Sequence, residues 1–247
     1  MPHDIIDNRN EKLVDHIQRI LPGSQSAKFA VGYFFLSGLE AVADRLANVQ
    51  ELRLLIGNTS NRETIEQIAE GYRRLEQVQS AAEALAYPKR TEMALAADAT
   101  AFNIGQTATL MDQTDEAEQL VSTLVRLIEE NRLKVRVYTK GRLHAKAYIF
   151  DYGPIYDGDG NPIPREERGI AITGSSNLTL AGVSSNTELN VLVHGNANHA
   201  ELTHWFEELW DEAQSFETYL MRELRQSWSL AQVTPYELYL KALYELV

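Results

Sequence analysis

The chain has 247 residues, enough for one or two domains with a large hydrophobic core. It contains no cysteine, which excludes disulfide bonds and thiolate metal sites, and its formal net charge of −12 at pH 7 argues at first against a polyanionic partner. No basic region followed by an apolar run stands at the N-terminus, and no window approaches the length of a membrane span. We therefore expect a cytoplasmic protein with no membrane partner.

Apolar periodicity predicts that helices and strands alternate along the chain. Helical periodicity occurs over residues 11–20, 37–47, 60–78 and 120–128, and two of these helices open with capping boxes, Ser37-Gly-Leu-Glu40 and Ser60-Asn-Arg-Glu63. Apolar runs typical of buried strands occur over residues 27–35, 52–56, 135–138, 170–173 and 188–193. Strands that alternate with helices indicate an α/β sheet with helices packed on both faces.

A further strand, expected over residues 143–149, carries chemically informative side chains. Four apolar residues alternate there with three polar ones, a pattern that predicts one buried face. On such a strand His144 and Lys146 project from the same side, so an imidazole and an ammonium can meet one phosphate group. A neutral imidazole can attack phosphorus while a second imidazolium protonates the leaving oxygen, so the cleavage is expected to need no metal and no cofactor.

A Gly-Ser-Ser-Asn turn at residues 174–177 is expected to converge on the same site. Ser175 and the exposed amides of the turn can form a small anion-binding concavity. Asn177 adds an amide donor, and with Lys146 it would stabilise the charge on a pentacovalent phosphorane. Each fragment alone has a simpler explanation, because a lone histidine in a strand is usually structural and Gly-Ser-Ser-Asn is ordinarily a turn.

Together these residues resemble the HxKxxxxD…GSxN signature of the phospholipase D superfamily. Four residues separate Lys146 from Asp151, as in the signature, but residues 152–173 form an insertion, expected to be a loop, where the family has a shorter connection. The resemblance implies a layered α/β/α sandwich with a mixed, largely buried β-sheet and a phosphohistidine intermediate on His144. It also implies that Glu188 hydrogen-bonds a histidine ring nitrogen, and that Asp151 and Gly174 support the turn.

Other polar clusters are expected to be structural. Asp157-Gly-Asp-Gly-Asn161 resembles the opening of a calcium loop, but Arg168 stands where the glutamate at the twelfth position is required, so a hairpin tip is expected. His199 and His204 have no apparent third metal ligand and are expected to be surface and packing residues.

A single histidine of the chain, His144, is followed by a lysine two residues later. Phospholipase D-like sites use two such motifs that face each other, so one chain holds half a site. The resemblance implies a homodimer in which His144 of one chain attacks and His144 of the other acts as the acid, with a twofold axis through the site.

Six basic residues and no acid lie within residues 131–150, in the stretch that leads into the motif. The five that precede the catalytic lysine are Arg132, Lys134, Arg136, Lys140 and Arg142. A local basic strip on an acidic chain can bind nucleic acid, so these five are expected to form a track for phosphates. The alternative is that the first three only solvate one strand face.

Residues 1–215 are expected to form the phospholipase D-like domain and residues 216–247 a helical extension. Pro235 begins a helix that then stops without a cap, so the chain is expected to continue into a further domain. This arrangement resembles the N-terminal domains of bacterial SNF2-type helicases and implies a C-terminal helicase domain.

Three functions remain open. The first is a metal-independent, nuclease-like phosphodiesterase in a helicase-linked DNA-processing protein. The second is a catalytically weak module that uses the same pocket to bind nucleic acid. The third is a phospholipid hydrolase, which is less favoured because no amphipathic basic helix or apolar surface segment is evident.

Overall fold

The computed structural model describes residues 4–34, 36–46, 49–57, 100, 104 and 115–226. The chain divides into two compact units, Met1–Asn58 with Asn131–Ser215 and Thr59–Glu130 with Phe216–Val247. The helix expected over residues 60–78 and the segment that begins at Pro235 lie outside the described residues. The expected division of the chain at residue 215 stays a prediction.

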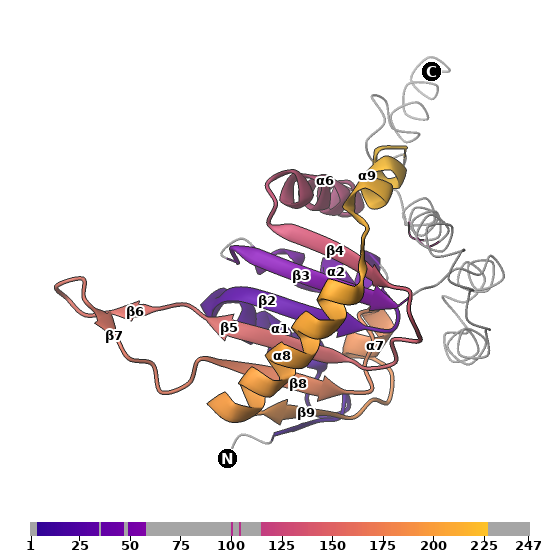
Figure 1. The fold of residues 1–247 in the computed structure, drawn as a ribbon. Coiled ribbons are helices and arrows are strands. Elements are labelled where there is room, and N and C mark those ends of the chain that lie inside the picture. The colour runs from indigo at the N-terminus through magenta and orange to yellow at the C-terminus, as the bar shows by residue number, and fades with distance from the viewer. Residues whose placement is uncertain are drawn as a thin grey trace, which may run out of the picture. The chain divides into compact units, whose positions relative to one another are not determined.

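The first unit is built on a mixed sheet, in which the described strands follow the order β1-β9-β8-β5-β2-β3-β4-β10 (Figure 1). Their bounds are β1 Ile5–Ile6, β2 Ser24–Val31, β3 Glu51–Gly57, β4 Leu133–Tyr138, β5 Ala147–Tyr152, β8 Gly169–Gly174, β9 Asn190–Val193 and β10 Gln214–Ser215. Strands β2, β3 and β4 are parallel, whereas β5, β8 and β9 pair antiparallel. The predicted mixed sheet is therefore confirmed.

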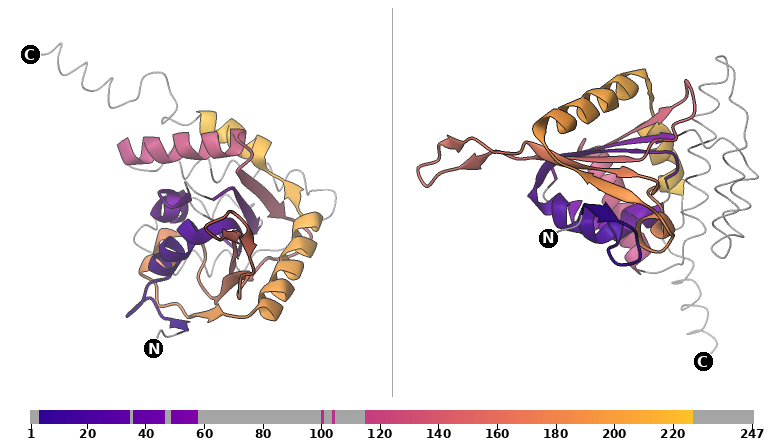
Figure 2. Two further views of the ribbon diagram at one scale, coloured as in Figure 1. Left: turned by 90° about the vertical axis from the view of Figure 1, so that its left-hand side faces the viewer. Right: turned by 90° about the horizontal axis from the view of Figure 1, so that it is seen from below.

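Helices cover both faces of this sheet (Figure 2). Helices α1 (Leu13–Ile20), α2 (Leu36–Ala43) and α7 (Leu180–Ser184) lie on one face, and the longer α8 (Asn196–Glu212) crosses the other. A short 3-10 helix, η1 (Leu21–Gly23), joins α1 to β2. The α/β fold with helices on both faces, predicted from alternating periodicity, is confirmed.

The two faces are packed differently. On the face of α1 and α2, Phe29 packs edge to face against Tyr148 and Phe150, with ring centroids 5.0 and 5.6 Å apart. On the α8 face, small strand residues such as Ala30 and Ala147 make room for the rings of α8. Burying a large apolar side chain contributes roughly 1.5–3 kcal/mol, so both faces help to hold β5 at the centre of the sheet.

Two local predictions were wrong. Strand β5 begins at Ala147 rather than residue 143, and it is buried on both sides instead of one, because helices cover both faces at this position. The capping box was also misplaced. Helix α2 begins at Leu36, so Ser37 lies inside the helix instead of capping it, and the helix ends at Ala43 rather than near residue 47.

The insertion after Asp151 forms a hairpin of β6 (Ile155–Tyr156) and β7 (Pro162–Ile163) that projects beyond the ends of the central strands (Figure 2). At its tip the Asp157 carboxylate accepts hydrogen bonds from the backbone amides of Asp159 and Asn161, at 3.0 and 2.8 Å. The predicted hairpin tip is confirmed.

Within the second unit, α6 (Asp115–Glu129) contacts α9 (Glu217–Gln226). Arg225 of α9 forms an ion pair with Glu129 of α6 at 2.7 Å. The helix expected over residues 120–128 is confirmed. No helix among the described residues is long and apolar enough to span a membrane.

Candidate active site

The predicted catalytic residues meet at the end of the sheet where β2 finishes and β5 begins. Gly32 follows β2 and lies against both contributing segments. A Cβ atom on Gly32 would stand 2.9 Å from the Leu143 carbonyl oxygen and 3.3 Å from Asn177 Oδ1. Glycine is therefore needed here, because it lets the segment before β5 and the Gly-Ser-Ser-Asn turn approach the end of β2.

His144 and Lys146 lie together directly before β5. Lys146 Nζ is 3.4 Å from His144 Nδ1. His144 is exposed, whereas Lys146 is 5% exposed. An ammonium beside an imidazole can donate to an oxygen of the same phosphate that the imidazole contacts, so the pair suits a phosphate ligand.

Asn177 lies on the same site and is 1% exposed. Its Oδ1 accepts a hydrogen bond from the backbone amide of Tyr33 at 2.9 Å, which fixes the orientation of the side-chain amide. Among the described residues, Asn177 Nδ2 has no hydrogen-bond partner. A buried donor without a partner costs about 1–3 kcal/mol, and a phosphate oxygen would remove that cost. Asn177 is thus held in position to donate to a ligand.

Two buried side chains hold the turn in place. The Tyr148 hydroxyl donates to the Ser176 carbonyl oxygen at 2.8 Å. Asn190 Oδ1 accepts from the Ser176 amide at 3.3 Å, and Asn190 Nδ2 donates to Ser176 Oγ at 2.8 Å. Burial, with the nearby charge of Glu188, raises the pKa of the Tyr148 hydroxyl, so it remains a neutral donor. Sequence analysis missed both residues, because their partners are distant along the chain.

Ser175 and Glu188 face each other at the edge of the site. The Ser175 hydroxyl donates to the Glu188 carboxylate and accepts from the Leu189 amide, at 3.0 Å in the second case. The structure therefore brings Glu188 to the predicted site through Ser175. Its predicted hydrogen bond to a histidine ring stays a prediction.

Asp151 lies at the other end of β5. Strand register pairs Ala147 with Thr173 beside the turn and Asp151 with Gly169, four residues away. At roughly 3.3 Å per residue this separates Asp151 from the turn by about 13 Å. The structure thus does not bring Asp151 together with the residues around Lys146.

The Asp151 carboxylate is enclosed by three donors. It accepts hydrogen bonds from Ser26 Oγ at 2.6 Å and from Lys28 Nζ, and it lies 3.3 Å from His199 Nε2. Burial alone would raise the pKa of Asp151, but the hydrogen bonds from His199, Lys28 and Ser26 outweigh it and hold the pKa below its usual value. His199, expected to be a packing or surface residue, is buried and lies against this carboxylate.

The five residues of the predicted track are spread over both ends of β4. Arg132 and Lys134 stand at the start of β4, at the Asp151 end of the sheet. Lys140 and Arg142 follow the other end of β4, where His144 lies.

Most of these side chains also have partners within the protein. Arg132 donates to the Leu46 and Val49 carbonyl oxygens, Lys134 pairs with Glu51, Arg136 donates to the Trp210 carbonyl oxygen, and Lys140 lies 3.3 Å from Glu212. The Arg136 guanidinium also lies over the Trp210 ring, 4.8 Å from its centroid, so it faces α8. Lys140 and Arg142 are the track residues that follow β4 at the His144 end of the sheet.

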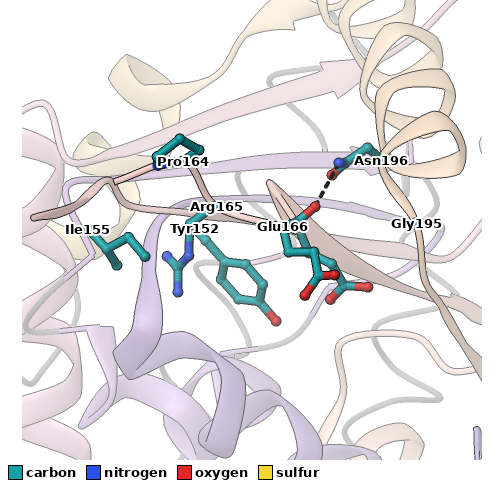
Figure 3. Close-up of a pocket in the computed structure, with 8 residues that line it drawn as sticks. Tyr152, Ile155, Pro164, Arg165, Glu166, Gly195 and Asn196 are labelled. Atoms are coloured by element: carbon teal, nitrogen blue, oxygen red, sulfur yellow. Dashed lines mark hydrogen bonds between the residues drawn. The ribbon is translucent and has the colours of Figure 1, made fainter. Parts of the chain in front are cut away.

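A separate pocket of about 770 Å³ lies at the base of the hairpin (Figure 3). Its lining residues are Tyr152, Ile155, Pro164, Arg165, Glu166, Glu167, Gly195 and Asn196. The Arg165 guanidinium lies 4.7 Å from the centroid of the Tyr152 ring, and Asn196 Nδ2 donates to the Glu166 carbonyl oxygen at 2.9 Å. Since Tyr152 ends β5, this pocket is distinct from the site at His144.

A family model described as cardiolipin synthase, PLD-like domain, matches residues 17–210. The match spans most of the chain and contains both the histidine-lysine segment and the turn. The chain belongs to this family of phospholipase D-like domains.

No curated protein matches the sequence. Among solved structures, Nuc of Salmonella typhimurium, a phospholipase D family member, is 11% identical over 85% of this chain and 95% of that chain, with a TM-score of 0.44. NucT from Helicobacter pylori is 10% identical over 86% and 97%, with a TM-score of 0.45. The phosphatidylserine synthase of Haemophilus influenzae is 12% identical over 100% and 46%, with a TM-score of 0.49. Similarity at this level carries no information on function.

Proposed function

We propose that the protein is a metal-independent phosphodiesterase that acts on nucleic acid through a phosphohistidine intermediate. The observation that carries the proposal is the meeting of His144, Lys146 and Asn177. They provide an exposed imidazole, a nearly buried ammonium and a buried amide donor that lacks a partner among the described residues. Membership of the phospholipase D-like family supports the same chemistry.

In the proposed reaction, a nitrogen of the neutral His144 imidazole attacks phosphorus and forms an N–P bond. The P–O bond to the leaving group breaks, and a second imidazolium transfers its proton to the departing oxygen. Lys146 and Asn177 donate to the phosphoryl oxygens as charge develops on them. Water activated by the second imidazole then cleaves the N–P bond and releases the phosphate product, which restores both histidines.

We propose that the second imidazole is His144 of another copy of the chain, because one chain supplies a single histidine-lysine motif. A twofold axis at the site would place two identical motifs on opposite sides of one phosphate. The partner of the protein is then a second copy of itself.

Nucleic acid is the proposed substrate because Lys140 and Arg142 follow β4 at the same end of the sheet as His144. Cations beside the reacting phosphate can bind the neighbouring phosphates of a polymer. A helicase domain in the full-length protein would supply such a substrate. The family description also names cardiolipin synthase, which favours phospholipid as the second candidate substrate.

The test is cleavage in the presence of EDTA. Wild-type protein is incubated with labelled single-stranded DNA, double-stranded DNA, RNA and phospholipid vesicles, alongside His144→Ala and a control, His204→Ala, which changes a highly exposed histidine on α8. We expect cleavage of a nucleic acid by the wild type and the control, and none by His144→Ala. An acid-labile phosphoryl adduct should form on the wild type and on the control, and not on His144→Ala.

Three results contradict the proposal in different ways. Cleavage of vesicles alone would leave the chemistry intact and replace the substrate. Tight binding of nucleic acid without turnover would make the protein a binding module. Cleavage that requires added Mg²⁺ and survives in His144→Ala would exclude the mechanism altogether.

A further inference from the structure

A second pocket, of about 570 Å³, lies between the base of the hairpin and α8. We call it the α8 pocket. It shares Tyr152, Arg165 and Asn196 with the neighbouring pocket shown in Figure 3, and residues of α8 complete its lining. Small-molecule sites occupy roughly 300–1,000 Å³, so the α8 pocket has room for a ligand much larger than a single phosphate. It lies at the Asp151 end of β5, away from His144.

Two arginines give the α8 pocket a positive lining. Arg165 Nη1 donates to the Gly153 carbonyl oxygen at 2.6 Å, and its guanidinium lies over the Tyr152 ring, so the group is held in place. The Arg168 backbone amide donates to Asn196 Oδ1 at 2.8 Å, which fixes this arginine beside the first residue of α8. Because a guanidinium carries several N–H donors in a planar fork, both arginines keep donors for a ligand.

The carboxylates that line the two pockets leave this positive charge in place. Asp151 lines the α8 pocket, but its carboxylate is already paired with Lys28 and lies 3.3 Å from His199. Glu166 and Glu167 line the neighbouring pocket instead. The α8 pocket therefore suits an anion.

The rest of the lining fits a ligand with both a polar head and an apolar body. Thr203 of α8 has a buried hydroxyl that lacks a hydrogen-bond partner among the described residues, and a ligand oxygen could accept from it. Buried polar groups are nearly always paired in native proteins, so an unused donor beside two arginines indicates a binding position. Pro154, Ile163 and Ala200 add an apolar wall.

We infer that the α8 pocket binds a phosphate monoester carried on a nucleoside. Two arginines match the charge of a monoester, roughly −1.5 to −2 near pH 7, better than the single charge of a diester. Their planar forks bind phosphate oxygens in pairs, and the apolar wall accommodates the nucleoside. Such a group occurs on a free mononucleotide and at the phosphorylated end of a nucleic acid. The inference goes beyond the proposed function, which concerns the diester at His144.

The test is calorimetric titration of the full chain carrying His144→Ala, which cannot form the proposed adduct. We expect adenosine monophosphate to bind, and adenosine and dimethyl phosphate to bind much more weakly. Adding Arg165→Ala and Arg168→Ala should weaken binding of the monophosphate by at least about tenfold, because hydrogen bonds to a charged group are lost. Thr203→Val, which keeps the shape of the side chain, should cause a smaller loss. The control adds Arg9→Ala and Arg45→Ala, exposed arginines outside the pocket, and should bind as its parent does.

An oligonucleotide with a terminal phosphate, compared with the same oligonucleotide without it, distinguishes the two sources. Tighter binding of the phosphorylated form identifies a nucleic-acid end as the ligand, whereas binding of the monophosphate alone identifies a free nucleotide, and both support the site. If the variant lacking both pocket arginines binds the monophosphate as its parent does, while Lys146→Ala abolishes binding, the phosphate lies at the His144 site and the inference fails. No binding by the parent, or equal affinity for dimethyl phosphate, would also overturn it. These outcomes do not depend on whether the wild type cleaves nucleic acid in EDTA.

Discussion

The two ends of strand β5 hold polar groups in opposite states. At the Asp151 end, the carboxylate has three donors around it and its pKa is lowered. At the other end, Asn177 Nδ2 is buried without a partner among the described residues, and Lys146 lies 3.4 Å from an exposed imidazole. A polar group whose bonds are complete stabilises the fold, whereas a buried group with an unused donor is prepared for a ligand.

This difference between the two ends of β5 separates the residues of the signature into a proposed catalytic group and a structural group. His144, Lys146 and Asn177 belong to the proposed chemistry, while Asp151, which the same signature contains, anchors β5 to β2 through Lys28. Substitutions at the His144 end of β5 should therefore lower turnover and leave the free energy of unfolding nearly unchanged. Substitutions at the Asp151 end should lower the free energy of unfolding and affect turnover less.

The largest effect is expected from Asp151→Ala. Removing one member of a largely buried ion pair leaves Lys28 without its countercharge, which costs about 3–5 kcal/mol. Urea unfolding should show a corresponding fall in the free energy of unfolding. Asp159→Ala at the exposed hairpin tip is the matched control and should change it by less than about 0.5 kcal/mol. If Asp151→Ala and Asp159→Ala were equally stable, Asp151 would not have the proposed structural role.

A loss of rate without a comparable loss of stability is expected from Asn177→Asp. The substitution keeps an oxygen that can accept from the Tyr33 amide, but it replaces the donor with an anion that repels phosphate. Removal of one such donor lowers turnover by roughly 10²–10³-fold. Cleavage assays in EDTA measure the loss of rate, and urea unfolding measures the stability of the variant. A variant that unfolds at much lower urea would show that Asn177 acts mainly in the fold.

Acid should weaken the Asp151 end selectively. Because the folded pKa of Asp151 lies below its unfolded value of 3.8, its contribution to stability is complete above pH 3.8 and is lost as the pH falls through the lower folded pKa. The free energy of unfolding of the wild type should therefore fall below about pH 4. Asp151→Asn should flatten that part of the profile, and an unchanged profile would contradict the assignment.

A smaller effect is expected from Tyr148→Phe, which removes the hydrogen bond to the Ser176 carbonyl oxygen and leaves that oxygen buried. The free energy of unfolding should fall by about 1–2 kcal/mol. Turnover should fall less than in Asn177→Asp, since the donor itself is retained. Tyr156→Phe, on the exposed hairpin, is the control and should behave as wild type.

The smallest effect concerns salt. Binding of nucleic acid should weaken with salt, and removing Lys140 and Arg142 together should reduce the logarithmic slope by about two. Removing Lys134 and Arg136 should change the slope less, because Lys134 lies toward the Asp151 end of the sheet and Arg136 faces α8. An equal reduction in both double variants would extend the track along the whole of β4.

Much of the fold could be predicted from local periodicity, because strands such as β3 and β8 are largely apolar and α1 has a clear apolar stripe. The start of β5 could not. Leu143 to Ile149 alternate in polarity as a half-buried strand would, but tertiary packing buries Lys146 and Tyr148 as well. The periodicity of a sequence reports which residues are polar. Burial at β5 depends instead on the helices that cover both faces of the sheet.

The meeting of the residues proposed for catalysis could be expected from their spacing, since His144, Lys146 and Asn177 do lie together. Their supporting contacts could not, because the Tyr33 amide and Asn190 are joined to the turn by the sheet rather than by sequence. The partners of Asp151 escaped prediction for the same reason. Lys28 is 123 residues away along the chain.

The projecting hairpin is a suitable place to insert a reporter protein. Its two legs leave and rejoin the sheet at adjacent points, where the Tyr152 amide donates to the Arg168 carbonyl oxygen at 2.8 Å. Each doubling of loop length there costs only about 0.6 kcal/mol, so a fluorescent protein inserted between Gly158 and Asp159 should leave the sheet intact. Chains carrying donor and acceptor fluorophores at this tip would report subunit exchange by energy transfer, with the reporter at the opposite end of the sheet from His144.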